Sequence, residues 1–95
     1  MANNINISLP PEGAPALTDA DPGDKIAWTN DTGYTVDGFT LPTCVSPQTS
    51  PAPILPGAKT REYTVNNAPT GEYGYSYDVD SPPRDTRSGT IDVGS

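Results

Sequence analysis

The sequence predicts a single all-β domain, a Greek-key β-sandwich of about seven short strands. Three observations support this prediction. Apolar and aromatic residues alternate with polar residues in short runs, and the 12 Pro and 9 Gly residues fall between those runs. No stretch of a dozen residues has the apolar spacing of three and four that an amphipathic helix requires. With 95 residues, the chain has the length of one domain, which we expect to cover residues 1–95.

Four extended segments are predicted in the N-terminal half, and turn-forming residues separate them: 5–9, 17–21, 25–29 and 34–41. The tripeptide Pro-Gly-Asp at 22–24 has the composition of a tight turn, since Pro sets φ at one central position and Gly permits a positive φ at the next. In the fourth segment, the apolar residues change parity on either side of Gly38. We therefore predict a β-bulge at Asp37 and Gly38, which returns the later apolar residues to the core.

The C-terminal half begins with the longest irregular stretch, the Pro-rich loop 42–58. A loop of this length inside a compact domain usually has a function or is mobile. Three further extended segments follow, with an irregular piece at 80–87 before the last of them: 60–65, 72–79 and 89–93. In 72–79 every second residue is Tyr or Val. Such a stripe is usually the core face of a strand, and the alternative is an aromatic platform for a carbohydrate or a proline-rich peptide.

Three sequence motifs follow one another over most of the chain. The first is Pro-Gly-Asp-Lys-Ile-Ala-Trp-Thr-Asn at 22–30, and the second is Leu-Pro-Gly at 55–57 with Tyr-Thr-Val at 63–65. The third is Pro-Thr-Gly-Glu-Tyr-Gly-Tyr-Ser-Tyr at 69–77, which leads to Ser-Gly-Thr-Ile-Asp-Val at 88–93. In this order and spacing the motifs resemble those of the cupredoxin family, the small blue-copper β-sandwiches. The resemblance implies a cupredoxin-like fold.

Members of that family bind copper through a His that follows the Trp-containing strand, and through a Cys, a His and a Met near the C-terminus. The motifs place Tyr34, Tyr77, Asp80 and Arg87 at these four positions, in that order. A blue-copper site requires imidazole and thiolate ligands, and this chain has no His. Its one Cys, Cys44, lies in the Pro-rich loop, away from every ligand position. The resemblance therefore implies the fold without the copper or its electron transfer, and we expect no metal or other cofactor.

The four replacements are expected to lie together at one end of the sandwich. Tyr34 and Tyr77 would be side by side, and Asp80 or Arg87 would form hydrogen bonds with their hydroxyls. We expect these side chains to fill the place of the copper site as a packed, hydrogen-bonded plug. The alternative is that they line a small pocket that binds a polar ligand.

The net charge of −7 disfavours nucleic acid and membrane surfaces as partners, because both are anionic. It favours solubility, and otherwise a basic partner or a divalent cation. Asp37, Asp78, Asp80 and Asp85 could together supply the carboxylate oxygens of a Ca²⁺ site, although no EF-hand spacing is present. The aspartates within 19–24 are explained more simply by turn and cap chemistry.

No catalytic arrangement is predicted. Without His, neither a Ser-His-Asp nor a Cys-His arrangement can form, and phosphate-loop, dinucleotide and zinc motifs are missing from the sequence. Paired carboxylates remain formally possible, but a domain of this size rarely has the deep cleft that such chemistry uses. Cys44 has no neighbouring cation that would lower its pKa, so we expect a buried, inert thiol. The alternative is an exposed thiol that pairs two chains or takes a modification.

Together these observations predict a non-catalytic module, a structural or protein-interaction domain that uses the Pro-rich loop and the former copper end. The partner would be another protein or a second copy of the chain. The alternative is binding of Ca²⁺ or of a small polar ligand at the former copper end. If Met1 is the natural start, we expect a cytoplasmic protein, and if a signal peptide has been removed, a secreted or periplasmic one.

Overall fold

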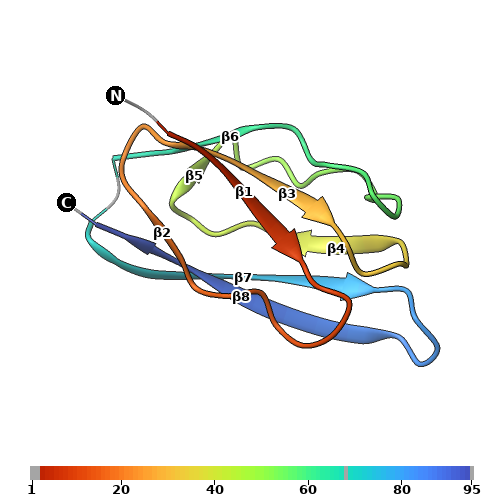
Figure 1. Ribbon diagram of the computed structural model, residues 1–95. Coiled ribbons are helices and arrows are strands. Elements are labelled where there is room, and N and C mark those ends of the chain that lie inside the picture. Colours follow the sequence, from red (N-terminus) through yellow and green to blue (C-terminus); the bar gives the residue numbers. More distant parts are fainter. Residues whose placement is uncertain (1–2, 68, 95) are drawn as a thin grey trace.

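Eight strands make up the regular structure of the residues that the computed structural model describes, 3–67 and 69–94 (Figure 1). The strands are β1 (Asn4–Leu9), β2 (Thr18–Ala20), β3 (Lys25–Asn30), β4 (Val36–Thr40), β5 (Val45–Ser46), β6 (Tyr63–Val65), β7 (Gly71–Val79) and β8 (Asp85–Val93). A helix long and apolar enough to cross a membrane is absent from this part of the chain.

The strands form two mixed sheets of four, which share one hydrophobic core. The first sheet has the order β1-β3-β6-β5 and the second β2-β8-β7-β4. Each contains one parallel pair, β1 with β3 and β2 with β8, and the other pairs are antiparallel. The predicted all-β class is confirmed, and the two sheets are consistent with the predicted β-sandwich. The described residues form eight strands, however, rather than about seven.

Trp28 of β3 connects the two sheets through aromatic contacts. Its side chain is fully buried, and its ring lies edge-on to the rings of Phe39, Tyr63 and Tyr75, at centroid distances of 5.0, 5.7 and 5.3 Å. Tyr63 belongs to the same sheet as Trp28, whereas Phe39 and Tyr75 belong to the opposite one. Edge-on aromatic pairs contribute about 0.5–1.5 kcal/mol each beyond the area that they bury, so this cluster stabilises the contact between the sheets.

Two predictions about individual side chains are confirmed. Tyr75 and Tyr77 of the tyrosine stripe are buried in the core, and Tyr73 packs against it. Cys44 is also fully buried, and burial raises the pKa of its thiol. A buried thiol with a raised pKa has little of the thiolate form that reacts.

The predicted β-bulge is present in β4. The pairing of β4 with β7 shifts register between Asp37 and Thr40, and Gly38 has a φ of +59°. A Cβ atom at Gly38 would lie 2.6 Å from Oδ2 of Asp78. Glycine is therefore favoured here by its backbone conformation, and a Cβ atom would in addition displace the carboxylate of Asp78.

The Pro-rich loop 42–58 contains more structure than the sequence predicts. β5 lies within it and pairs with β6, and Ile54 forms an antiparallel bridge with Val36 through backbone hydrogen bonds of 2.7 and 3.0 Å. A strand of two residues is too short to show the alternation on which the prediction depends.

Two other strands begin three or four residues away from the predicted position, and the remaining boundaries differ by two residues or fewer. β6 begins at Tyr63 rather than Thr60, and β8 begins at Asp85 rather than Gly89. Every residue of β8 pairs with β7, so the two strands form a long hairpin (Figure 1). The start of β8 is polar on both faces and carries no apolar alternation, so only its backbone pairing identifies it.

Candidate functional site

The two tyrosines that the sequence predicts to be neighbours have different surroundings. Tyr77 is fully buried in β7 and its ring stacks on that of Phe39 at a centroid distance of 5.9 Å. Tyr34 lies in the connection between β3 and β4, where 45% of it is exposed. One phenol therefore belongs to the core and the other to the surface.

The Tyr77 hydroxyl has no well-aligned hydrogen-bond partner among the described residues, although Arg87, its neighbour on β8, is close enough to affect its pKa. Burial raises the pKa of this hydroxyl, and the positive charge of Arg87 opposes the rise. The guanidinium donates instead to a carboxylate oxygen of Asp85 at 2.9 Å and to the carbonyls of Pro10 and Pro11 at 2.9 and 3.2 Å. Arg87 thus holds the segment after β1 against β8.

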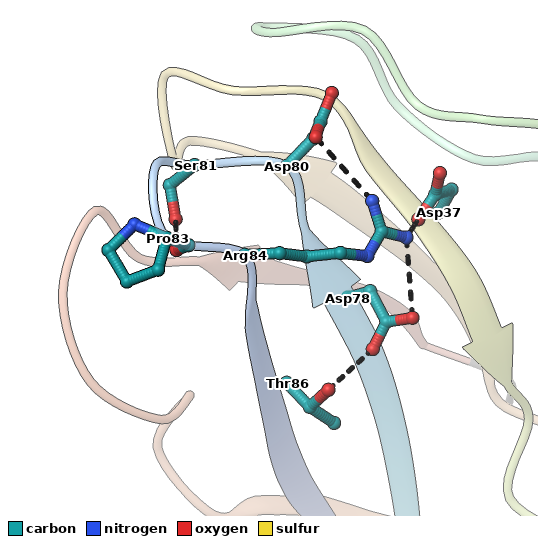
Figure 2. Close-up of polar contacts among 7 residues, drawn as sticks. All are labelled: Asp37, Asp78, Asp80, Ser81, Pro83, Arg84 and Thr86. Atoms are coloured by element: carbon teal, nitrogen blue, oxygen red, sulfur yellow. Dashed lines mark hydrogen bonds and ion pairs between the residues drawn. The ribbon is translucent and has the colours of Figure 1, made fainter.

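Asp80, the remaining predicted residue, belongs to a cluster around Arg84 (Figure 2). Arg84 lies in the turn between β7 and β8, and its guanidinium forms ion pairs with Asp80 at 3.5 Å, with Asp78 at 3.4 Å and with Asp37 of β4. A hydrogen bond from the Thr86 hydroxyl and the charge of Arg84 lower the pKa of Asp78. We name these four charged residues the Arg84 cluster.

The predicted Ca²⁺ ligands are therefore brought together only in part. Asp37, Asp78 and Asp80 gather, but a guanidinium lies among them (Figure 2), and Asp85 pairs with Arg87 instead. Within 3–67 and 69–94, no three His, Cys, Asp or Glu side chains are arranged to hold a metal ion. The role of Arg84 cannot be predicted from the sequence, because nothing in a turn sequence indicates which carboxylates an arginine will contact.

A groove of about 430 Å³ lies beside the Pro-rich loop, bounded by residues 49–55 on one side and 58–61 on the other. We call it the Pro-loop groove. Hydrogen bonds connect both walls to the sheets. The Tyr63 hydroxyl donates to the carbonyl of Thr49 at 2.9 Å, and the Ser50 hydroxyl donates to the carbonyl of Phe39 at 2.9 Å. On the other wall, the Thr60 N–H donates to the Trp28 carbonyl at 2.8 Å.

Asn30, at the end of β3, holds the groove wall from beneath. Its buried side-chain amide donates to the carbonyls of Tyr34 and Ile54 at 2.6 and 2.8 Å. Its side-chain oxygen accepts from the backbone N–H and the hydroxyl of Thr32 at 3.0 and 2.6 Å. All the hydrogen-bonding capacity of this buried side chain is used, as a stable buried amide requires. The groove wall at Ile54 is therefore tied to the β3–β4 connection.

The Pro-loop groove combines apolar and cationic groups. Leu55 at its edge is 63% exposed, and Lys59 and Arg61 are exposed on the opposite wall. Among the described residues every ion pair involves Arg84 or Arg87, so neither cation of the groove is paired with a carboxylate. The length of the loop predicts a functional or mobile segment, and the sequence does not indicate that these two cations lie beside it.

Comparison with protein-family models and with curated proteins found no match for this chain.

Proposed function

We propose that this chain is a non-catalytic, copper-free, cupredoxin-like module that acts as a protein-interaction domain, with the Pro-loop groove as its binding surface. The observation that supports the proposal is the groove itself, about 430 Å³ in volume, which combines exposed apolar surface at Leu55 with the exposed cations Lys59 and Arg61. Its walls are bonded to both sheets, so the surface is preformed. The occupant would be another protein or a second copy of the chain.

The cupredoxin-like, Greek-key assignment is part of this proposal. Two mixed four-stranded sheets, each with one parallel strand pair, support it together with the motif order of the sequence. The chemistry of the four ligand positions supports a copper-free module, because Tyr, Tyr, Asp and Arg do not supply the imidazoles and thiolate of a blue-copper site.

The titratable groups support a non-catalytic role. The hydrogen bond from Thr86 and the charge of Arg84 lower the pKa of Asp78, and burial raises the pKa of Tyr75 to about 12. A general acid or base works best when its pKa lies near the working pH, and these shifts move the groups away from neutrality. Binding of Ca²⁺ at the former copper end has less support than protein interaction, because Arg84 already pairs with three of the four proposed ligands.

A selection from a random peptide library tests the proposal. The affinity of the enriched peptides is then measured for the unmodified chain and for Ala52→Trp. This variant places an indole ring in the Pro-loop groove at an exposed position. Ala14→Trp is the matched control, since it places the same ring in a second hollow of about 390 Å³ beside β1. We expect Ala52→Trp alone to lose binding. If no peptide is enriched, or if Ala52→Trp binds as well as the unmodified chain, the groove is not an interaction site.

A further inference from the structure

We infer that the Pro-loop groove takes an extended, acidic segment of a partner protein, which adds as a strand beside residues 58–61 and places its carboxylates on Lys59 and Arg61. The inference rests on the proposed function and specifies the chemistry of the partner.

The backbone of 58–61 offers one open edge for strand addition. The Asn30 N–H donates to the Ala58 carbonyl at 2.9 Å, and the Thr60 N–H donates to the Trp28 carbonyl at 2.8 Å. Successive residues of an extended segment direct their N–H and C=O groups to opposite sides, so those of Lys59 point away from β3. Among the described residues, neither group of Lys59 has a backbone partner. An added strand would satisfy both groups.

The neighbouring strand ends before it covers this edge. β5 pairs with β6 only at Val45 and Ser46, and the chain beyond Ser46 forms the far wall of the groove instead of continuing along 58–61. That wall contains Pro51 and Pro53, which have no N–H to donate. The directional backbone contacts therefore come from the 58–61 side, and the proline wall supplies apolar surface.

The charge of the groove selects an acidic segment. Lys59 and Arg61 both line the groove. The pairings of Thr29 with Lys59 and of Ile26 with Tyr63 leave one extra residue between Lys59 and Tyr63, so the segment bulges there, and Arg61 lies 5.9 Å from the ring centroid of Tyr63. A partner segment that carries more than one carboxylate can contact both cations. The net charge of −7 does little to oppose the contact, because charges beyond about 8 Å are screened at physiological salt.

Three pools of end-capped eight-residue peptides test the inference. In each pool Val, Ile, Leu or Pro alternates with a second residue type, which is acidic (Glu or Asp), neutral (Gln or Asn) or basic (Lys or Arg). Binding to the full chain is followed by backbone amide NMR. We expect the acidic pool to shift amides within 49–61, to slow exchange of the Lys59 amide, and to bind about fivefold or more tightly than the neutral pool.

The charge-reversal variant Lys59→Glu/Arg61→Glu should bind the basic pool in preference to the acidic one. Lys25→Glu is the matched control, since Lys25 is exposed on β3 and does not line the groove, and it should keep the preference for the acidic pool.

The outcomes separate the inference from the proposed function. If the neutral pool binds within 49–61 as tightly as the acidic pool, the acidic-strand inference is overturned and the proposed function stands. Failure of all three pools to shift these amides would count against both. Concentration-dependent shifts of the same amides without peptide would identify a second copy as the occupant and overturn the inference.

Discussion

Tyr77 of β7 and Arg87 of β8 are direct partners in the antiparallel register, yet the guanidinium donates to the carbonyls of Pro10 and Pro11 rather than to the phenol. Arg87 stands at a position where the family resemblance implies a metal ligand. In this chain the residue connects the β7–β8 hairpin to the segment that leaves β1.

Removal of this connection should destabilise the fold. For Arg87→Met we expect a loss of about 1–3 kcal/mol in the free energy of unfolding, because two carbonyls lose a charged donor. Urea unfolding measures the change, and Lys25→Met, at an exposed position without an ion pair among the described residues, is the control. Equal stability of Arg87→Met and the unmodified chain would show that the contact contributes nothing.

Asn30→Asp should loosen the wall of the Pro-loop groove. The substitution removes the two N–H donors to Tyr34 and Ile54 and places a carboxylate beside two carbonyl oxygens, with an expected cost of about 2–4 kcal/mol at neutral pH. Protonation restores one donor, so the cost should fall in acid. Asn66→Asp, which changes a more exposed amide, is the matched control. A pH-independent cost would contradict the hydrogen-bonding explanation.

Gly38→Ala should destabilise the fold more than an alanine substitution at a glycine that has a positive φ but no close neighbour. The new Cβ would meet the Asp78 carboxylate at 2.6 Å, so we expect a loss of about 2–4 kcal/mol. Gly13→Ala is the comparison, because Gly13 also has a positive φ but nothing lies within 4 Å of its added Cβ, and its cost should be about 1 kcal/mol. Similar losses at the two positions would show that the backbone conformation alone explains the need for glycine.

The stability of the fold should fall above pH 10 through Tyr75. Burial raises the pKa of its hydroxyl to about 12 in the folded chain, against about 10 when unfolded. The folded state therefore holds the proton more tightly, and the resulting contribution is complete below pH 10 and is lost as the pH rises from 10 to 12.

In Tyr75→Phe this loss should be smaller by up to about 2–3 kcal/mol across that range, and the loss that remains comes from Tyr63 and Tyr77, whose pKa values burial also raises. At pH 7 the same variant should be nearly as stable as the unmodified chain, because the hydroxyl lies near the Trp28 indole N–H but forms no well-aligned hydrogen bond among the described residues. Urea unfolding at pH 8 and pH 11 measures both effects, with Tyr34→Phe at the surface as the control. If the stability of Tyr75→Phe and that of Tyr34→Phe fall by the same amount between pH 8 and pH 11, the assignment to Tyr75 is wrong.

Arg84→Gln tests whether the acidic residues can hold a cation. Without the guanidinium, Asp37, Asp78 and Asp80 repel one another, so we expect a lower Tm that recovers partly with millimolar Ca²⁺ and with salt. The unmodified chain should show almost no Ca²⁺-dependent change in Tm, and Arg61→Gln serves as the control. If millimolar Ca²⁺ raises the Tm of the unmodified chain as much as that of Arg84→Gln, the result would instead favour the Ca²⁺ alternative.

Local patterns were sufficient to predict much of the fold. The parity change around Gly38 identified a bulge, and alternation identified the buried face of β7. The start of β8 escaped prediction because its side chains are polar, and β5 because it has two residues. In both cases only pairing with a distant strand defines the element.

The candidate site was harder to predict, because its contacts join residues far apart in the sequence. Arg87 binds Pro10, which lies 77 residues away, and Arg84 binds Asp37 at a separation of 47. Lys59 and Arg61 become neighbours of the Pro-rich wall only when segment 58–60 pairs with β3. Periodicity and turn chemistry can be read from local sequence patterns, whereas contacts between residues this far apart cannot be predicted from them.

The chain has one Trp, and that indole touches rings from both layers of the interior. Its fluorescence is therefore an intrinsic optical reporter for separation of the layers, with no attached dye. A ligand that occupies the surface groove and leaves the layers together should change the emission of Trp28 little, so the same signal distinguishes binding from unfolding.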